Sequence, residues 1–581
     1  MAEAPLARAT PFARVARFRL GLDTIVLGAT AAVIGYLVLT PIAFLIISSF
    51  RRYQLEGSIG FVFTLDNYAD TFLNPEIPAA ATNSLIYALG GTVLAIVFGT
   101  ALAWVVERTN TPFRGAYVVL AAATYFVPGV LMAISWNALA HVRIGSLNRL
   151  LQNFIDVTQG PFDVNSLLGM IWVFGTHLYP IVFLIMAAAF RAMDPALEEA
   201  AALSGAGLWA GLRTITLAVS RPALISALLI VFVRGLESFD VPLILGLPGK
   251  INVLTTEIFA TAQIHRPPEL GISATLGLVL LIVSIGGVWV YRSATARALA
   301  FATISGKGYR PNRLDLGRRR WAVAAVCLLF FFLTLVLPLI QVVWLSLFPF
   351  VRQFSLEALS RASFAQYAYV LNYGAILDAF RNSLLNAAGV AAIIVVLTSI
   401  AAWITVRSRA PARWLLDALA FAPIGIPGPI MGVSVLLAYL TLPIPLYGTI
   451  LIITVAHVTL FLPYGMRLAS DALLRIHPQL EEASALSGAS WLHTYRTILV
   501  PLILPGSVAA FITIFAASFR ELSSALFLAS PQSRFVSVVM YSTWQDGNAT
   551  SAAALGIVML VVVLALALAA RLLARFVRVA A

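Results

Sequence analysis

The sequence predicts an all-α integral membrane protein of about twelve transmembrane helices in two homologous halves of six. Two observations carry this prediction. First, 60% of the 581 residues are apolar and only 11% are charged, a composition that excludes a soluble domain. Second, apolar runs of about 20 residues, enough to cross a hydrocarbon core about 30 Å thick, recur about six times in each half.

The spans are predicted from these runs in chain order. Those of the first half are expected at residues 24–49, 82–105, 115–139, 166–190, 221–246 and 270–292. Those of the second half are expected at residues 321–348, 382–406, 414–440, 448–469, 506–529 and 552–574. The third span of each half is the least regular, because Pro128-Gly129 and Pro427-Gly428 interrupt it. Proline removes a backbone hydrogen bond and glycine allows close approach, so these sites are either gates or packing kinks.

The basic residues predict the orientation, because cytoplasmic loops hold an excess of Lys and Arg. With the N-terminus inside, 26 of the 38 basic residues are cytoplasmic, 10 are external and two lie within spans. Residues 296–320 form a basic cytoplasmic linker between domains 1–295 and 321–581. Both termini are then cytoplasmic. The net charge of +13 follows from topology, so no nucleic-acid partner is expected.

The two halves are copies of one another. "NSLIYALGGTVLAIVFGTALAWVVERTNTPFRG" from Asn83 matches "NSLLNAAGVAAIIVVLTSIAAWITVRSRAPARW" from Asn382, at an offset of 299. Because each half holds an even number of spans, both halves enter the membrane in the same direction. This is the symmetry of a two-domain pore, the alternative being an old duplication without functional symmetry.

A second repeated phrase follows the fourth span of each half, on the cytoplasmic side. "LEEAAALSGAG" begins at Leu197 and "LEEASALSGAS" at Leu480. The glutamates suit the positive end of a short helix, and Gly205 and Gly488 suit the left-handed residue that closes it. A helix, a tight turn and a second helix are therefore predicted at residues 194–222 and 477–505.

These phrases resemble the EAA loops of ABC importer permeases, in which the loop is a coupling helix that sits in a groove of the ATP-hydrolysing subunit. The first copy departs from the pattern at Ala218, where proline is expected. The resemblance implies coupling roles for Glu198, Glu199, Ala200, Gly205, Ile215, Glu481, Glu482, Ala483, Gly488, Ile498 and Pro501.

The resemblance covers nearly the whole chain as two fused permeases, each of the type I importer fold. Fused pairs resemble the ferric-iron permeases, and "ESFDVPLILGLPGKINVLTTEIF" from Glu237 is most typical of that group. Aminoalkylphosphonate and thiamine permeases have a similar layout and remain alternatives. The resemblance implies a bacterial inner-membrane protein with two cytoplasmic ATPase subunits, an external solute-binding protein and surrounding lipid as partners.

Charged residues in the fifth and eleventh spans are the candidate translocation path. Arg234 and Glu237 are expected to pair along one helix face with Asp240 one turn further, whereas Arg520 and Glu521 point to different sides. Pairing between helices and a wet path between the halves both remain open. Pro128, Gly129, Pro427 and Gly428 are the candidate gate.

Other chemistry is not indicated. The sequence has no G-x-x-x-x-G-K-[ST] phosphate loop, so the chain is not expected to be an enzyme and its energy must come from a partner or a gradient. A gradient-driven transporter is the alternative class, but it needs no duplicated docking helix. Cys327 has no cysteine partner, and the six histidines lack ligand-like spacing, so no cofactor or metal site is expected.

Overall fold

The computed structural model describes residues 22–52, 62–152, 160–194, 196–205, 207–299, 313–408 and 413–580. The helices of the first half are α1 Leu22–Ser49, α2 Asp66–Leu73, α3 Glu76–Arg108, α4 Arg114–Phe126, α5 Gly129–Ala140, α6 Ser146–Gln152, α7 Leu167–Ala192, α8 Ala196–Leu203, α9 Leu208–Gly211, α10 Leu217–Val219, α11 Arg221–Leu236, α12 Leu254–Phe259 and α13 Leu270–Leu299. Those of the second half are α14 Arg319–Phe331, α15 Leu337–Ser346, α16 Leu356–Leu359, α17 Ala365–Asn372, α18 Gly374–Val406, α19 Arg413–Phe421, α20 Gly428–Thr441, α21 Ile450–Leu474, α22 Gln479–Leu486, α23 Trp491–Thr494, α24 Val500–Phe519, α25 Ala525–Leu528, α26 Val536–Gln545 and α27 Ala549–Ala580.

Short π-helical or 3-10 segments join some of these helices. They are π-helical at Leu212–Thr216, Pro242–Gly246, Ala260–Ile264, Phe332–Val336 and Tyr495–Leu499, and 3-10 at Ala422–Gly425. Within the described ranges, extended pairing is limited to two isolated bridges, Arg51 with Phe63 and Thr109 with Leu314.

The predicted all-helical membrane architecture is confirmed. Among the described residues, nine helices are long and apolar enough to cross a membrane, and the number rises to twelve if each of three bent pairs is one span. α3 and α18, at matching places in the two copies, each run for 33 residues. They begin several residues before the predicted spans, because the preceding segments are also compatible with helix.

The third span of each half is not a single helix. α4 and α5 meet at 96°, and the segment Arg413–Gly425 meets α20 at 111°. Both breaks fall where Pro128 and Pro427 follow an extended residue, because the proline ring disfavours helical geometry in the residue before it and removes an amide donor. The predicted continuous spans 115–139 and 414–440 were therefore wrong in shape, although the site of irregularity was predicted.

The fifth and eleventh spans are shorter than predicted. α11 ends at Leu236 rather than at residue 246, and α24 ends at Phe519 rather than at residue 529. After α24, the Glu521 carboxylate accepts hydrogen bonds from the backbone amides of Ser524 at 2.8 Å and Ala525 at 3.2 Å. This carboxylate caps the short helix that follows, so the chain turns instead of continuing as one helix.

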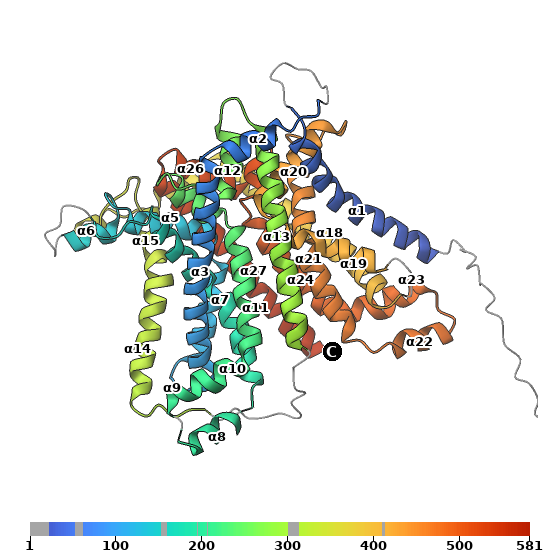
Figure 1. Cartoon of the computed structure of the whole chain (residues 1–581), viewed down its shortest axis with the longest axis horizontal. Coiled ribbons are helices and arrows are strands. Elements are labelled where there is room, and N and C mark those ends of the chain that lie inside the picture. Colours follow the sequence, from blue (N-terminus) through green and yellow to red (C-terminus); the bar gives the residue numbers. More distant parts are fainter. Residues whose placement is uncertain are drawn as a thin grey trace, which may run out of the picture.

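The first helix of each half packs against the opposite half (Figure 1). α1 lies along α18, α19 and α20, and its Tyr36 hydroxyl lies 2.9 Å from that of Tyr439. α14 lies against the first half, where Phe331 stacks on Tyr117 with ring centroids 5.8 Å apart. The two halves are therefore interlocked, and a movement between them involves both exchanged helices.

Candidate functional site

Two matching hairpins lie on one side of the helix bundle, the side to which α27 also descends (Figure 1). The first runs from α8 into α9, and the second from α22 into α23. Gly205 has φ +81° and Gly488 has φ +80°, the left-handed geometry that favours glycine. The predicted helix, turn and helix are confirmed in both copies, whereas the coupling role of their residues stays a prediction.

The first glutamate of each phrase faces the bundle. A buried Arg108, at the end of α3, places its Nη2 3.1 Å from Glu198 Oε2, and the Thr216 hydroxyl donates to Glu198 Oε1 at 2.6 Å. In the second half, Arg407 Nε lies 3.2 Å from Glu481 Oε1, and Trp403 Nε1 donates to Glu481 Oε2 at 3.0 Å. Each hairpin is thus ionically tied to the end of the long helix α3 or α18.

The remaining residues of the phrases lie mostly on the outer surface. Ala200, Glu482, Ala483 and Pro501 are exposed, Ile215 and Ile498 are half-buried, and the side chain of Glu199 lies outside the described residues. Two exposed side chains were missed by sequence reasoning: Leu203 and Leu486, at equivalent positions, are each 90% exposed. Their matching spacing in the two phrases was the signal that could have identified them.

The two hairpins differ in how they join the next span. Leu212–Val219 meets α11 at a bend of 68°, whereas Trp491–Phe519 runs as one span. The first copy carries Ala218 where the second carries Pro501. The structure therefore shows unequal geometry at the copy that departs from the expected pattern.

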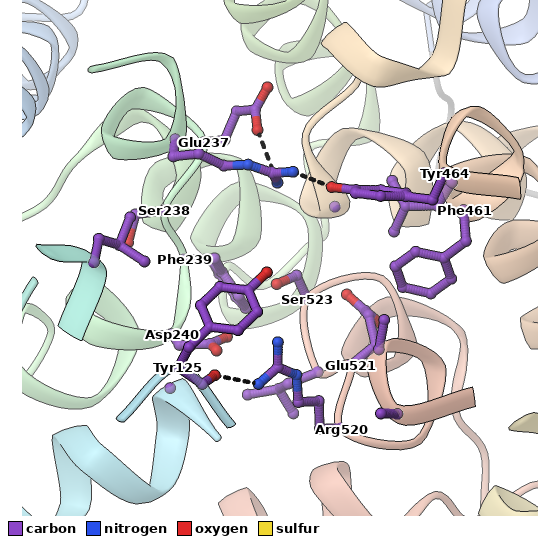
Figure 2. A pocket seen from close by; sticks show the side chains of 18 of the residues that line it. Tyr125, Glu237, Ser238, Phe239, Asp240, Phe461, Tyr464, Arg520, Glu521 and Ser523 are labelled. Carbon is purple, nitrogen blue, oxygen red and sulfur yellow. Dashed lines mark hydrogen bonds and ion pairs between the residues drawn. The ribbon is translucent and has the colours of Figure 1, made fainter. Parts of the chain in front are cut away.

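A cavity of about 580 Å³ lies between the halves. It is lined from both sides by the ends of α4, α11 and α24, by α7 and α21, and by the turns that follow α11 and α24. Figure 2 shows the charged and aromatic side chains that surround it. All nine predicted path and gate residues except Pro128 and Pro427 line this cavity, and those two prolines directly precede lining glycines.

The predicted path residues occupy different positions in the backbone from those expected, because most of them lie beyond the ends of the helices. The predicted pair of Arg234 and Glu237 is confirmed, with Nη1 3.4 Å from Oε2. Asp240 does not continue the same helix face, because α11 ends at Leu236. Glu237, Asp240, Arg520 and Glu521 all lie beyond the helix ends, where an irregular backbone is tolerated because it lines a cavity.

Two arginines bridge the halves across this cavity (Figure 2). Arg234 of the first half donates to the Tyr464 hydroxyl of the second. Arg520 of the second half donates from Nη1 to the Tyr125 carbonyl of the first at 2.7 Å and lies over the Tyr125 ring. Separating the halves at this level requires both bridges to break.

The three carboxylates of the cavity are not equivalent. Glu237 Oε1 and Asp240 Oδ1 are buried and have no hydrogen-bond partner among the described residues. The Glu521 carboxylate, in contrast, has hydrogen-bond partners. Its Oε2 lies 3.1 Å from His457 Nε2 and accepts a hydrogen bond from the Ser524 hydroxyl at 2.8 Å. A buried polar atom without a partner is unfavourable, so Glu237 and Asp240 each keep one carboxylate oxygen free to accept a hydrogen bond or to contact a cation.

The glycines of the breaks touch the turns that carry these charges. A Cβ on Gly129 would lie 2.6 Å from Asp240 Oδ2, and one on Gly428 would lie 2.6 Å from Ser523 Cβ. Asp240 and Ser523 occupy equivalent positions in the two copies. Each Pro-Gly break therefore packs on the turn of its own half, which links the candidate gate to the candidate path.

Sequence reasoning missed Tyr125, Tyr464 and His457. The buried His457 Nδ1 lies 2.8 Å from the Ser518 hydroxyl and 3.1 Å from the Asn386 amide. At the aligned positions the first half has Phe174 and Tyr87 instead of His457 and Asn386. This coordinated exchange of aromatic for polar residues was the available signal.

Duplicated membrane halves, a cavity between them that contains charged side chains, and paired hairpins are typical of a membrane transport protein. The family described as "Binding-protein-dependent transport system inner membrane component" matches residues 394–579. The ferric transport system permease protein FbpB of Actinobacillus pleuropneumoniae is 28% identical over 84% of this chain and 70% of its own length. The sulfate transport system permease protein CysT of Salmonella typhimurium is 30% identical over 35% of this chain and 78% of its own. A putative 2-aminoethylphosphonate transport system permease protein, PhnV of Salmonella paratyphi A, is 29% identical over 26% of this chain and 58% of its own.

The chain belongs to this family of binding-protein-dependent transport system inner membrane components. It is a transmembrane permease of an ABC importer with two fused copies in one chain. The fold class and the family resemblance expected from the sequence are thereby confirmed.

Proposed function

We propose that this permease carries ferric iron, received from an external solute-binding protein, through the cavity between its halves. The single observation that carries the proposal is the pair of unpartnered carboxylate oxygens, Glu237 Oε1 and Asp240 Oδ1, inside that cavity. Ferric iron is a hard cation, and hard cations favour carboxylate oxygen. The relative FbpB, which is named as a ferric transport system permease and aligns over 84% of this chain, supports the same cargo.

The cavity suits transit better than storage. Among the described residues, no three His, Cys, Asp or Glu side chains come together in a group that could hold a metal ion. A conduction site must bind strongly enough to admit a solute and weakly enough to release it. Two separate carboxylates meet that requirement for a cation.

ATP hydrolysis is assigned in this proposal to separate cytoplasmic subunits that dock on the two hairpins. The exposed Leu203 and Leu486 give each hairpin an apolar contact, and matched exposed apolar residues are typical of an interaction surface. Glu198 and Glu481 tie the same hairpins to α3 and α18. A movement of the docked subunit is thereby passed to α3 and α18, which pack against cavity-lining helices: α3 against α7 and α11, and α18 against α21 and α24.

The hairpin side is proposed to be the cytoplasm of a bacterial cell, with both termini on that side. The distribution of basic residues supports this orientation. Gly306, in the middle of the basic linker 296–320, lies outside the described residues, but Arg318, Arg319 and Arg320 stand at the start of α14 on the hairpin side. To check this assignment, the exposed Ser487 is replaced by cysteine and treated with an impermeant thiol reagent. We expect labelling from the cytoplasmic face of the membrane and none from the external face.

An anionic cargo is the second candidate, because Arg234 and Arg520 also line the cavity and two relatives are named for sulfate and 2-aminoethylphosphonate. The two candidates make opposite predictions. Glu237→Gln should slow uptake of a cation, and Arg520→Gln should slow uptake of an anion.

The test is uptake of radioactive ferric iron by the assembled transporter, at equal amounts of inserted permease. We expect Glu237→Gln and Asp240→Asn each to slow iron uptake about tenfold, the effect of about 1.4 kcal/mol of lost interaction with the cation. Ser238→Ala, which removes a neighbouring hydroxyl but no charge, is the control and should transport normally. Iron uptake at the parent rate in both carboxylate variants would refute ferric iron as the cargo of this cavity.

A further inference from the structure

A second cavity, of about 780 Å³, lies away from the path at the hairpin-side end of the first half. Three arginines line it from three separate elements: Arg114 at the start of α4, Arg191 at the end of α7, and Arg313 before α14. Glu107 is the acidic residue among the lining residues. The cavity therefore carries a formal charge of +2, from three arginines and one glutamate.

The guanidinium groups of the three arginines differ in the ion pairs and hydrogen bonds that they make. Arg191 pairs with Glu107, with Nη2 2.5 Å from Oε1. Arg114 donates to the Thr109 carbonyl at 3.3 Å and makes no ion pair. Arg313 has neither a hydrogen bond nor an ion pair with any residue that the structure describes. Arg114 and Arg313 thus share one cavity, and the carboxylate among its lining residues, that of Glu107, is paired with Arg191.

The backbone holds Arg313 in this position. Leu314, the next residue, forms a parallel bridge with Thr109; its amide donates to the Arg108 carbonyl at 2.9 Å and its carbonyl accepts from the Asn110 amide at 3.1 Å. The Asn110 side chain donates to Asp315 Oδ1 at 2.5 Å. Hydrogen bonds from the Gly317 backbone amide and from the Asn110 side chain lower the pKa of Asp315. The connection is therefore built to hold a basic residue beside Arg114.

Apolar surface borders the charged part of the cavity. Phe113 is exposed and packs edge-on against the exposed Trp321, with ring centroids 6.5 Å apart. Val118, also exposed, lines the cavity one turn further along α4. Trp and other aromatic residues gather where a membrane meets water, so this cavity lies at the level of lipid headgroups.

The second half does not repeat this set of charged residues at the equivalent positions. Arg413 corresponds to Arg114 and makes the same kind of bond, to the Ser408 carbonyl at 2.9 Å. Glu107 and Arg191, however, correspond to Val406 and Leu474. The cluster is thus an addition to the duplicated plan and is not required by the path or the hairpins.

We infer that the cavity of Arg114, Arg191 and Arg313 binds a phosphate-bearing anion, and that the apolar border selects the headgroup of an anionic phospholipid. Basic pockets between helix ends are suited to such headgroups. The bound phosphate pairs with Arg114 and Arg313 at the same time and thereby ties the inter-domain connection to the first half. The inference does not depend on which solute is transported.

Binding is measured on the delipidated full-length protein in detergent, with phosphatidylglycerol, phosphatidylcholine and inorganic phosphate as separate probes. We expect phosphatidylglycerol, but not phosphatidylcholine, to raise the melting temperature. Arg114→Gln with Arg313→Gln should weaken phosphatidylglycerol binding about thirtyfold, from about 1 kcal/mol for each basic residue. Arg413→Gln, the matched variant of the second half, should bind as the parent does.

The two sources of phosphate are separated by competition. If inorganic phosphate at millimolar concentration neither stabilises the protein nor displaces the lipid, the headgroup is the ligand. If inorganic phosphate does both, a soluble phosphate compound is the ligand of the same arginines. Arg313→Gln alone, on an exposed side chain, covers the case in which the double variant does not fold. Equal binding of both lipids, or parent-like binding by Arg313→Gln and the double variant, would overturn the inference.

Discussion

Gly488→Glu is expected to abolish transport while the protein still inserts and melts near the parent temperature. Gly488 has φ +80°, and a Cβ built on it meets nothing within 4 Å. A larger side chain therefore disturbs little inside the permease itself but projects from the turn onto the proposed ATPase groove. Uptake, co-purification with the ATPase and thermal melting are measured together. Gly205→Glu is expected to act in the same way in the first copy.

Backbone strain is separated from obstruction of docking by Gly488→Ala. A residue with a Cβ in the left-handed region costs about 1–2 kcal/mol, and alanine introduces that strain without bulk or charge. We expect Gly488→Ala to retain most of the ATPase association and uptake. Equal losses in the alanine and glutamate variants would attribute the effect to strain and remove this support for docking.

Glu198→Gln is expected to uncouple the first hairpin from the bundle. Arg108 is 2% exposed and its ion-pair partner is Glu198, so the substitution leaves a buried charge unpaired. Breaking such a pair from one side costs about 3 kcal/mol or more. Thermal melting and ATP-driven uptake should both fall.

The double variant Glu198→Gln with Arg108→Met separates stability from coupling. Removing both charges leaves no unpaired buried group, so melting should return toward that of the parent. Uptake should stay low, because the hairpin is no longer tied to the end of α3. If uptake recovered together with stability, the pair would be structural and would transmit nothing.

The features that could be predicted from the sequence are those set by local chemistry. Span length follows from the bilayer thickness, and the left-handed turns at Gly205 and Gly488 follow from a glycine after a short helix. Pro128 and Pro427 located the breaks correctly, because the effect of proline on its own helix is local. The duplication was evident because only two constant differences in residue number were needed to align the two halves.

The features that could not be predicted depend on partners far away in the chain. α24 ends at Phe519 because Glu521 caps the next helix and contacts His457, and nothing in the apolar run announces this. Tyr125 and Tyr464 matter because arginines of the opposite half reach them. Glu198 was interpreted only as part of a docking motif, but its side chain faces inward because Arg108 lies at the end of α3.

We propose that the cavity between the halves is the translocation path and that the ATPase opens it. The bridges from Arg234 to Tyr464 and from Arg520 to Tyr125 join the two halves across the cavity in the present structure. A cysteine at Ala517, which lines the cavity at the position equivalent to Arg234, reports on its access to water.

The most direct measurement is the rate at which an impermeant thiol reagent labels Ala517→Cys in the assembled transporter, in a Cys327→Ala background. Ser487→Cys, exposed in the hairpin, should be labelled from the cytoplasmic side in every state, and Ala554→Cys, fully buried, in none. The proposed path predicts slow labelling of Ala517→Cys at rest and labelling at least tenfold faster when ATP and the loaded binding protein are supplied. Labelling of Ala517→Cys that is as slow as that of Ala554→Cys in every state would contradict it.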